Sequence, residues 1–198
     1  MSRFKEYLEQ LVEGDNLSEE QASDALTQII EGEVGSEQMA AFLFGLRAKG
    51  ETVDEMTAFV KVMRDAAVPV NVDTTGAVDL CGTGGDHANT FNISTAAMFV
   101  VAGAGVPVLK HGNRSVSSRS GSADVLEALG AEPSLHAQDV EKCFDETKMA
   151  FMFAPYYHPA MKHIMPARKG LGMRTFFNVL GPLLNPAKVR RQMIGAFS

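Results

Sequence analysis

The sequence has little cysteine and no long apolar run, and both shortages narrow the class of protein. Its 198 residues include two cysteines, Cys81 and Cys143, which match no spacing typical of metal ligands. A chain of this length can bury a core without disulfides, so we interpret both as free thiols in a reducing compartment. No apolar run approaches the roughly 20 residues that cross a bilayer, and the first ten residues have the pattern of an amphipathic helix, not of a signal peptide. We therefore expect a soluble, cytoplasmic protein with no membrane partner.

Positive charge is also scarce at the start of the chain. Residues 1–70 contain 6 basic and 14 acidic residues, whereas residues 71–198 contain 12 basic and 10 acidic ones. Nucleic-acid binding needs broad neutralisation of phosphates, so the acidic first third argues against such a partner. The mildly basic remainder is compatible with a small anionic ligand.

The first 70 residues have the pattern of four helices. Apolar residues recur at helical spacing, Gly14, Gly32 and Gly50 mark predicted helix ends, and Ser36 is the predicted cap of the third helix. Capping boxes open the second helix at Ser18–Gln21 and the fourth at Thr52–Glu55. We predict a small α-helical bundle domain at residues 1–70.

From residue 71 the pattern changes to short strands alternating with longer helices. The predicted strands are 78–80, 106–109, 149–153 and 193–197, and this alternation is typical of a mainly parallel α/β sheet. We therefore predict a larger α/β domain at residues 71–198. The interrupted helical segment 159–184 is expected to pack between the two domains.

Two loops that follow successive strands carry the chemistry. Gly82-Thr-Gly-Gly-Asp86 follows the first strand, and Asn92-Ile-Ser-Thr95 opens an apolar helix. Glycines allow close approach of a ligand, and a helix N-terminus offers N–H groups to an anion. A glycine turn of this kind also serves strand–helix packing alone. Two familiar phosphate-binding motifs are excluded. The dinucleotide-binding fingerprint needs a third glycine or alanine at the position of His87, and the loop that binds nucleoside triphosphates needs a Gly-Lys-Ser/Thr sequence, which does not occur.

The second loop strengthens the phosphate interpretation. Residues 110–123 contain Lys110, Arg114 and Arg119 with five serines and no acidic residue. We expect this segment to lie outside the core, and its cations to repel one another unless an anion lies among them. At the same end of a parallel sheet, the two loops would form one anion site.

Four motifs resemble the anthranilate phosphoribosyltransferases of tryptophan biosynthesis. They are Gly82-Thr-Gly-Gly-Asp86, Asn92-Ile-Ser-Thr95, Lys110-His-Gly-Asn113 and Gly181-Pro-Leu-Leu-Asn-Pro186. The resemblance implies transfer of the 5-phosphoribosyl group from phosphoribosyl pyrophosphate (PRPP) to the amino group of anthranilate, with release of pyrophosphate. It also implies Mg²⁺ as cofactor and a homodimer formed through the N-terminal helices.

The resemblance assigns roles to individual residues. Anthranilate would be held by Gly82, Asn113 and Arg168, with Arg168 at its carboxylate, and Ser94 would be a Mg²⁺ ligand. Lys110, His111, Asn113 and Arg114 would be catalytic. PRPP would contact Gly82, Gly85, Asp86, Thr90, Asn92, Ile93, Ser94, Thr95, Lys110, His111, Gly112, Asn113, Arg114, Ser115, Val116, Ser117, Ser118 and Ser122.

One departure from the family leaves alternatives open. Family members are longer and carry an Asp-Glu pair for Mg²⁺ beyond the strand that here ends near Phe197, and no such pair follows it in this chain. We therefore expect an α/β domain that is truncated at its C-terminus. The alternatives are a non-catalytic fragment and an enzyme of the related pyrimidine nucleoside phosphorylases, which the Lys110-His-Gly-Asn-Arg114 motif fits less well.

Overall fold

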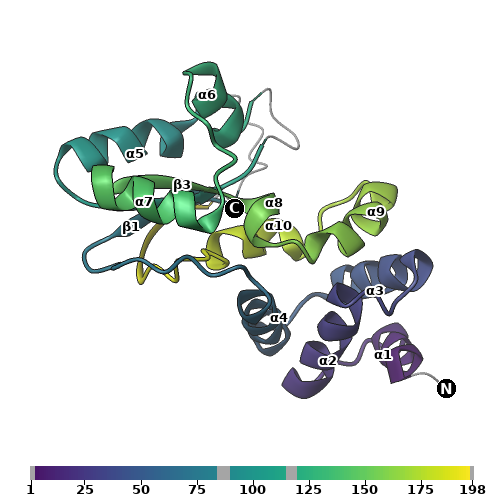
Figure 1. Ribbon diagram of the computed structural model, residues 1–198. Helices are drawn as coiled ribbons and strands as arrows, with labels where there is room; N and C mark the ends of the chain where they lie inside the picture. The colour runs from purple at the N-terminus through teal and green to yellow at the C-terminus, as the bar shows by residue number, and fades with distance from the viewer. Residues whose placement is uncertain (1–2, 84–89, 115–119, 197–198) are drawn as a thin grey trace. The chain divides into compact units, whose positions relative to one another are not determined.

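A computed structural model describes residues 3–83, 90–114 and 120–196 (Figure 1). The chain divides into two compact units. One contains Met1–Ala66 and Pro159–Leu180, and the other contains Ala67–His158 and Gly181–Ser198. We call them the helical unit and the α/β unit. The predicted boundary at residue 70 and the predicted packing of 159–184 between domains stay predictions.

The helical unit contains the four predicted N-terminal helices and two later ones. They are α1 (Arg3–Val12), α2 (Glu19–Ile30), α3 (Ser36–Lys49), α4 (Val53–Asp65), α9 (Met161–Leu171) and α10 (Phe177–Leu180). Both predicted capping boxes are confirmed, at Ser18 and at Thr52. The cap predicted at Ser36 is wrong by one residue, because Gly35 precedes the helix and Ser36 is its first residue. No described helix is long and apolar enough to cross a membrane.

A buried carboxylate stabilises the helical unit. Glu55 is fully buried and accepts the N–H groups of Leu17 at 2.9 Å and Thr52 at 2.8 Å, while Lys49 Nζ lies 3.0 Å from its Oε2 atom. Burial alone raises the pKa of Glu55, but the two N–H groups and the ammonium outweigh it and hold the pKa below its ordinary value. The carboxylate therefore joins the segment before α2 to the end of α3 and the start of α4.

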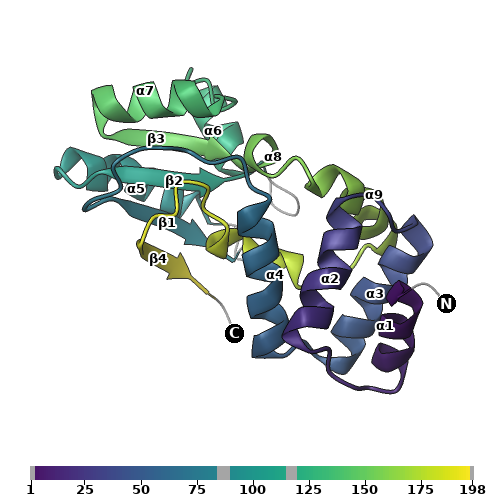
Figure 2. The ribbon, with the colours of Figure 1, turned by 60° about the horizontal axis from the view of Figure 1, so that its bottom comes forward.

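The α/β unit is built on a four-stranded parallel sheet. Its strands are β1 (Val78–Gly82), β2 (Val108–Gly112), β3 (Met149–Phe153) and β4 (Arg191–Gly195), in the order β3-β2-β1-β4 (Figure 2). The helical segments of this unit are α5 (Ile93–Gly103), α6 (Ser122–Ala128), α7 (Ala137–Thr147), α8 (Ala154–Tyr157) and the 3₁₀ turn η1 (Gly181–Leu183). The predicted fold class, a helical bundle plus a mainly parallel α/β domain, is confirmed.

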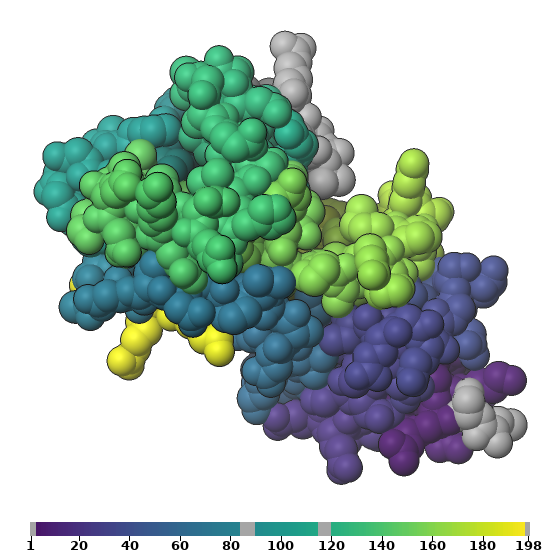
Figure 3. Space-filling model, in the orientation of Figure 1, coloured from purple at the N-terminus to yellow at the C-terminus, as the bar shows by residue number. Residues whose placement is uncertain are grey.

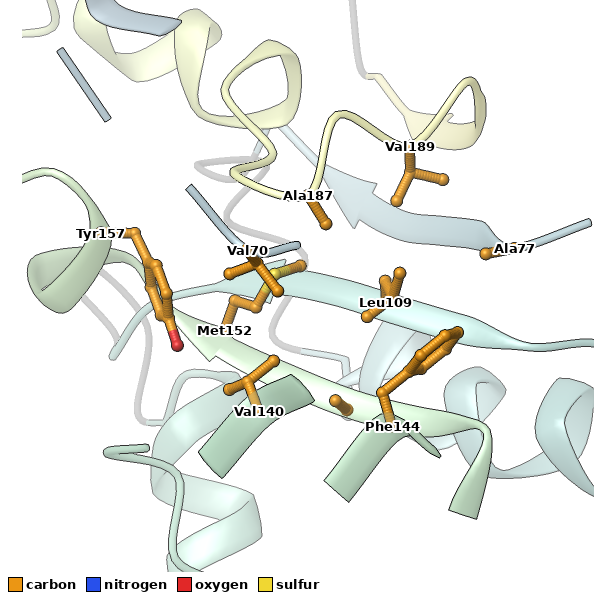
Figure 4. Packing of buried hydrophobic residues seen from close by; sticks show 10 residues of the cluster. Val70, Ala77, Leu109, Val140, Phe144, Met152, Tyr157, Ala187 and Val189 are labelled. Carbon is orange, nitrogen blue, oxygen red and sulfur yellow. The ribbon is translucent and has the colours of Figure 1, made fainter. Parts of the chain in front are cut away.

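Separate apolar clusters cover the two faces of the sheet. On one face Leu80, Val108 and Phe151 pack with Met98 of α5 and Leu126 of α6. On the other face α7 and the segment before β4 cover the strands (Figure 4), through Val70, Ala77, Leu109, Val140, Phe144, Ala150, Met152, Tyr157, Ala187 and Val189. Parallel sheets need this cover on both faces.

The strand boundaries differ from the prediction where polar residues continue a strand. β2 was predicted to end at Leu109, but it continues through Lys110, His111 and Gly112. Lys110 is 2% exposed and His111 is 6% exposed. The expectation that the whole segment from Lys110 onward lies outside the core is therefore wrong for these two residues.

Candidate functional site

The N-termini of α5 and α6 are joined by side chains. Asn92 precedes α5, and its amide donates to the carbonyl of Ser120 at 3.1 Å and accepts from the Ser120 hydroxyl at 3.2 Å. In the first turn of α5 the Thr95 hydroxyl donates to that of Ser122, the first residue of α6, at 2.9 Å. The N–H groups of a helix N-terminus attract anions, so two such ends lie together here.

Both loops begin at the carboxyl edge of the sheet. β1 ends at Gly82 and the adjacent parallel strand β2 ends at Gly112, and the carbonyl of Asn113 accepts from the N–H of Ala123 at 3.3 Å. Ligands of parallel α/β sheets bind at this edge. The structure thus brings Asn92, Thr95, Asn113 and Ser122 together in the α/β unit, and their role in binding PRPP stays a prediction.

Gly112 is required by close packing. A Cβ atom added at this position would lie 2.7 Å from Cε2 of Phe151. We expect Gly112→Ala to lower the free energy of unfolding by about 1–3 kcal/mol, because the ring must shift within a packed core. Urea denaturation measures this loss. Gly103→Ala is the matched control, since an added Cβ there meets nothing within 4 Å, and an equal loss in both variants would contradict the packing explanation.

Lys110 lies inside the unit and not in the loop. Its ammonium donates to the carbonyl of Leu80 at 2.6 Å. Burial lowers the pKa of Lys110, and the nearby carboxylate of Asp79 opposes that shift. Asp79 is itself buried, and it accepts from the N–H of His111 at 3.2 Å and from Gln192 Nε2 at 3.1 Å. Burial raises the pKa of Asp79 in spite of these bonds.

Arg114 does not depend on a bound anion for charge balance. Its guanidinium pairs with Asp124 at 3.0 Å and Glu127 at 2.6 Å, both on α6, and lies over the ring of Phe153. The argument that the cations of this segment need an anion among them is therefore wrong for Arg114. Residues 110–123 contain no acid, but the next helix supplies two.

His111 and His158 form a buried pair of neutral rings. Their centroids are 5.2 Å apart. His111 Nδ1 lies 3.2 Å from the carbonyl of Gly181, and His158 Nε2 lies 3.0 Å from that of Leu184. A carbonyl only accepts, so both of these nitrogens carry the proton. Among the described residues no hydrogen-bond partner faces the second nitrogen of either ring.

The segment Gly181–Pro186, one of the four motifs, positions the two histidine rings. Two of its carbonyls hold the histidines, and Asn185 Nδ2 donates to the carbonyl of Leu109 in β2 at 3.0 Å. Sequence analysis assigned no role to His158. Its position directly after β3 and α8, beyond the carboxyl end of a strand, is the signal that could have identified it.

The histidine pair predicts a pH dependence of stability. Burial, with smaller contributions from His158 and Lys110, lowers the pKa of His111 to about 3, whereas an unfolded histidine titrates near 6.5. The unfolded chain therefore binds more protons between these values, and stability falls as pH drops from about 6.5 towards 3.

Between about pH 3 and 6.5 the free energy of unfolding changes with pH in proportion to the number of protons taken up on unfolding. We expect His111→Gln to reduce that number by up to about one. Urea denaturation between pH 4 and 7 measures the slope. The exposed His136 gives the control His136→Gln, and an unchanged slope in His111→Gln would contradict the buried neutral state.

The remaining predicted residues lie in different places. Thr90 and Ile93 are exposed, and Ser94 is half-buried in the first turn of α5. Arg168 belongs to the helical unit, where its guanidinium lies 5.4 Å from the ring centroid of Phe177 and burial lowers its pKa. Six predicted PRPP contacts lie outside the described residues, namely Gly85, Asp86, Ser115, Val116, Ser117 and Ser118.

The described residues do not by themselves fit a magnesium ion. Mg²⁺ prefers six oxygens, usually one or two carboxylates with phosphates and water. Ser94 contributes one hydroxyl, and no group of three acidic, histidine or cysteine side chains that could hold a metal occurs in residues 3–83, 90–114 and 120–196. We therefore derive no step through a metal.

Comparison with known families accounts for both parts of the chain. Residues 74–198 match the a/b domain of a glycosyl transferase family, and residues 5–67 match its helical bundle domain. The chain belongs to this glycosyl transferase family. The match to the helical bundle domain and the match to the a/b domain both agree with the fold described above.

Two similar proteins are anthranilate phosphoribosyltransferases. The chain is 57% identical over 190 residues to the anthranilate phosphoribosyltransferase of Salinibacter ruber, covering 96% of this chain and 55% of that protein. It resembles the crystal structure of that enzyme from Thermus thermophilus, with a TM-score of 0.90 and 42% identity over 97% of this chain and 58% of that one.

A further relative is the Saccharomyces cerevisiae enzyme in complex with PRPP and Mg, with a TM-score of 0.90 and 30% identity over 98% of this chain and 58% of that one. The resemblance to anthranilate phosphoribosyltransferases inferred from the four motifs is confirmed. The chain spans little more than half the length of these relatives.

Proposed function

We propose that this chain carries the PRPP-binding part of an enzyme that transfers the 5-phosphoribosyl group from PRPP to anthranilate. The products are N-(5-phosphoribosyl)anthranilate and pyrophosphate, in the second step of tryptophan biosynthesis from chorismate. The observation that carries the proposal is the meeting of the α5 and α6 N-termini through Asn92 and Thr95 at the carboxyl edge of the sheet. Relatives with the same fold have this activity in their names.

PRPP would occupy the edge where these helices meet. Backbone N–H groups of the first turn of α5 would bind phosphate oxygens, with the hydroxyls of Ser94, Thr95 and Ser122 beside them. The assignments that fall outside the described residues, such as Gly85 and Asp86, stay predictions, and so does the role of Arg114, whose charge Asp124 and Glu127 already balance.

The chemistry separates charge at the ribose. Breaking the bond between C1 and pyrophosphate builds positive charge on the sugar and negative charge on the leaving group, while the anthranilate nitrogen forms the new bond to C1 and then loses a proton. Fixed positive groups at the leaving group lower this barrier. Lys110 would supply such a charge; its ammonium bonds the carbonyl of Leu80, two residues before β1 ends at Gly82.

The acceptor needs positioning more than deprotonation. An aniline nitrogen is unprotonated near neutral pH, so no strong general base is required. Asn113 and Gly82 would orient the ring, and Arg168 would bind the carboxylate through its planar fork. If His111 contacts the acceptor, its unprotonated Nε2 would accept a hydrogen bond and would not act as a cation.

Three further assignments belong to the proposal. Mg²⁺ would be the cofactor, with Ser94 as one protein ligand; the yeast relative is in complex with PRPP and Mg. A homodimer through the N-terminal helices and a cytoplasmic location follow from the family resemblance. Neither is needed for the chemistry described above.

A steady-state assay tests the proposal. The chain is mixed with PRPP, anthranilate and Mg²⁺, and the loss of anthranilate fluorescence is recorded. The same assay is run on a chimera in which this chain replaces the 190 matched residues of the Salinibacter ruber relative. We expect PRPP-dependent turnover by the chimera. Turnover by the 198-residue chain alone would refute the interpretation that it is a non-catalytic fragment. A chimera that cleaves pyrimidine nucleosides with phosphate but does not use PRPP would refute the proposed phosphoribosyl transfer.

Arg168 should act on anthranilate and not on PRPP. We expect Arg168→Ala in the chimera to raise the KM for anthranilate at least about tenfold, because a bidentate charged contact of about 1.5–3 kcal/mol is lost. The KM for PRPP should stay within about twofold. Lys169→Ala, at the exposed neighbouring position, is the control, and an unchanged KM for anthranilate in Arg168→Ala would exclude the assigned role.

A further inference from the structure

Arg168 is a half-buried cation without an acidic partner. It lies in the last turn of α9, where the N–H of Gly172 donates to its carbonyl at 3.2 Å. This helix packs against α2 and α3 of the same unit, and Figure 3 shows its yellow-green surface beside their purple and blue surfaces. Charged side chains that leave solvent are normally paired. In the part of the chain that the structure describes, however, the Arg168 guanidinium makes no ion pair and no hydrogen bond.

Two other features compensate the charge of Arg168. The end of a helix carries a partial negative charge, which favours a cation in the last turn. The guanidinium also lies over the ring of Phe177, with Cζ 5.4 Å from the ring centroid, and the face of an aromatic ring attracts a cation. Neither interaction uses the five N–H donors of the guanidinium. The fork that binds a carboxylate through both oxygens is therefore available.

The ring of Phe177 is itself held in place by the core of the helical unit. It is 7% exposed and stacks on the ring of Phe176, with centroids 4.3 Å apart. Phe176 in turn stacks on Phe59 of α4 at 4.4 Å, and Phe59 is fully buried. Asn178 fixes the turn that carries these rings, because its Oδ1 atom accepts the N–H of Thr175 at 3.0 Å. Stacked rings thus connect the interior of the helical bundle to the guanidinium.

We propose that Phe177 is a positioning residue, whose ring fixes the direction of the Arg168 guanidinium so that its N–H donors face the carboxylate of the aromatic acceptor. The inference rests on the proposed function, which assigns that carboxylate to Arg168. An arginine side chain has a large rotamer entropy, and a ligand that orders it must overcome this entropy. A guanidinium that a ring already holds loses less entropy on binding, so the acceptor binds more tightly.

Side-chain NMR spectra of the isotope-labelled 198-residue chain test the positioning without any reaction. Arg168→Lys identifies the Nε–Hε signal of Arg168 by its loss. We expect this signal to be shifted by the ring current of Phe177 and to have an order parameter above about 0.6, the level below which a group is flexible. In Phe177→Leu the order parameter should fall below about 0.6. A flexible Arg168 in the wild type, or equal order in both proteins, would overturn the proposal.

Kinetics of the chimera test the consequence for the acceptor. Phe177→Leu should raise the KM for anthranilate by about three- to thirtyfold, the range expected for loss of a cation–π contact. The kcat and the KM for PRPP should stay within about twofold. In the Arg168→Ala background the same replacement should leave the KM for anthranilate unchanged, because Phe177 acts through the guanidinium. A further rise in that background would overturn the proposal.

Phe42→Leu is the matched control. Phe42 is a fully buried aromatic residue of the same unit, and its ring contacts those of Phe4 and Phe59. Its replacement should leave the KM for anthranilate within about twofold of the wild type, although it removes a similar amount of core packing. An equal rise of this KM in Phe42→Leu and Phe177→Leu would show that Phe177 is only structural.

Two further outcomes are kept apart by the design. If urea denaturation shows that Phe177→Leu is unfolded, Phe177→Met takes its place, since methionine fills an irregular space without an aromatic face, and the same results are expected. A chimera without PRPP-dependent turnover would refute the proposed function but not the positioning of Arg168, which the order parameters then decide alone.

Discussion

Replacing Lys110 with methionine should lower PRPP-dependent turnover of the chimera at least about 100-fold, as loss of a preorganised charge at a leaving group does. The side chain is 2% exposed and its ammonium bonds the carbonyl of Leu80. Methionine has a similar volume and fits an apolar environment, so we expect the free energy of unfolding to change by less than about 2 kcal/mol. A buried lysine that is dispensable for folding and required for turnover is a functional one.

Two measurements separate this prediction from simple unfolding. Fluorescence assays give turnover, and urea denaturation of the same preparation gives stability. Lys142→Met, at an exposed position of α7, controls for loss of charge. Full turnover in Lys110→Met would remove the residue from the mechanism, and parallel loss of stability and turnover would show that its role is structural.

The second large effect is expected in the helical unit. Glu55→Ala should lower the free energy of unfolding by about 3–5 kcal/mol, because it leaves the buried Lys49 ammonium without its counter-charge and the N–H groups of Leu17 and Thr52 without their acceptor. The exposed Glu9→Ala should change stability by less than about 0.5 kcal/mol. Because the pKa of Glu55 is lowered on folding, its contribution is present above the unfolded pKa and is lost as pH falls through the folded value.

Urea denaturation followed by circular dichroism measures this loss. Glu55→Gln keeps an acceptor of the same shape but not the charge, so it should fall between the wild type and Glu55→Ala. A Glu55→Ala variant as stable as Glu9→Ala would show that the network around the carboxylate is not a source of stability.

Local features of the fold could be predicted from the sequence because their causes are local. The capping boxes at Ser18 and Thr52 need only residues three positions apart, and both are present. β3 was predicted at its observed bounds, since its five residues are apolar and the turn and helix signals around it are short-range. The α/β class followed from the alternation of such segments.

The interior of the site could not be predicted because its partners are distant in sequence. Lys110 is buried by a bond to Leu80, 30 residues away, and Arg114 finds its acids on the following helix. The spacing of residues along 110–123 predicts neither the burial of Lys110 nor the acidic partners of Arg114. His158 pairs with His111 only after β2 and β3 lie side by side, so the order of the strands had to be known first.

The most direct test of the central claim is a titration of the isotope-labelled chain with PRPP and Mg²⁺, followed by amide NMR spectra. We predict saturable shifts at PRPP concentrations up to about 1 mM, a usual upper limit for enzyme substrates. The shifts should be largest at Asn92–Thr95, Asn113 and Ser122, where the ends of α5 and α6 meet. A spectrum that does not change at these residues, or that changes only in the helical unit, would contradict the assignment of this edge as the PRPP site.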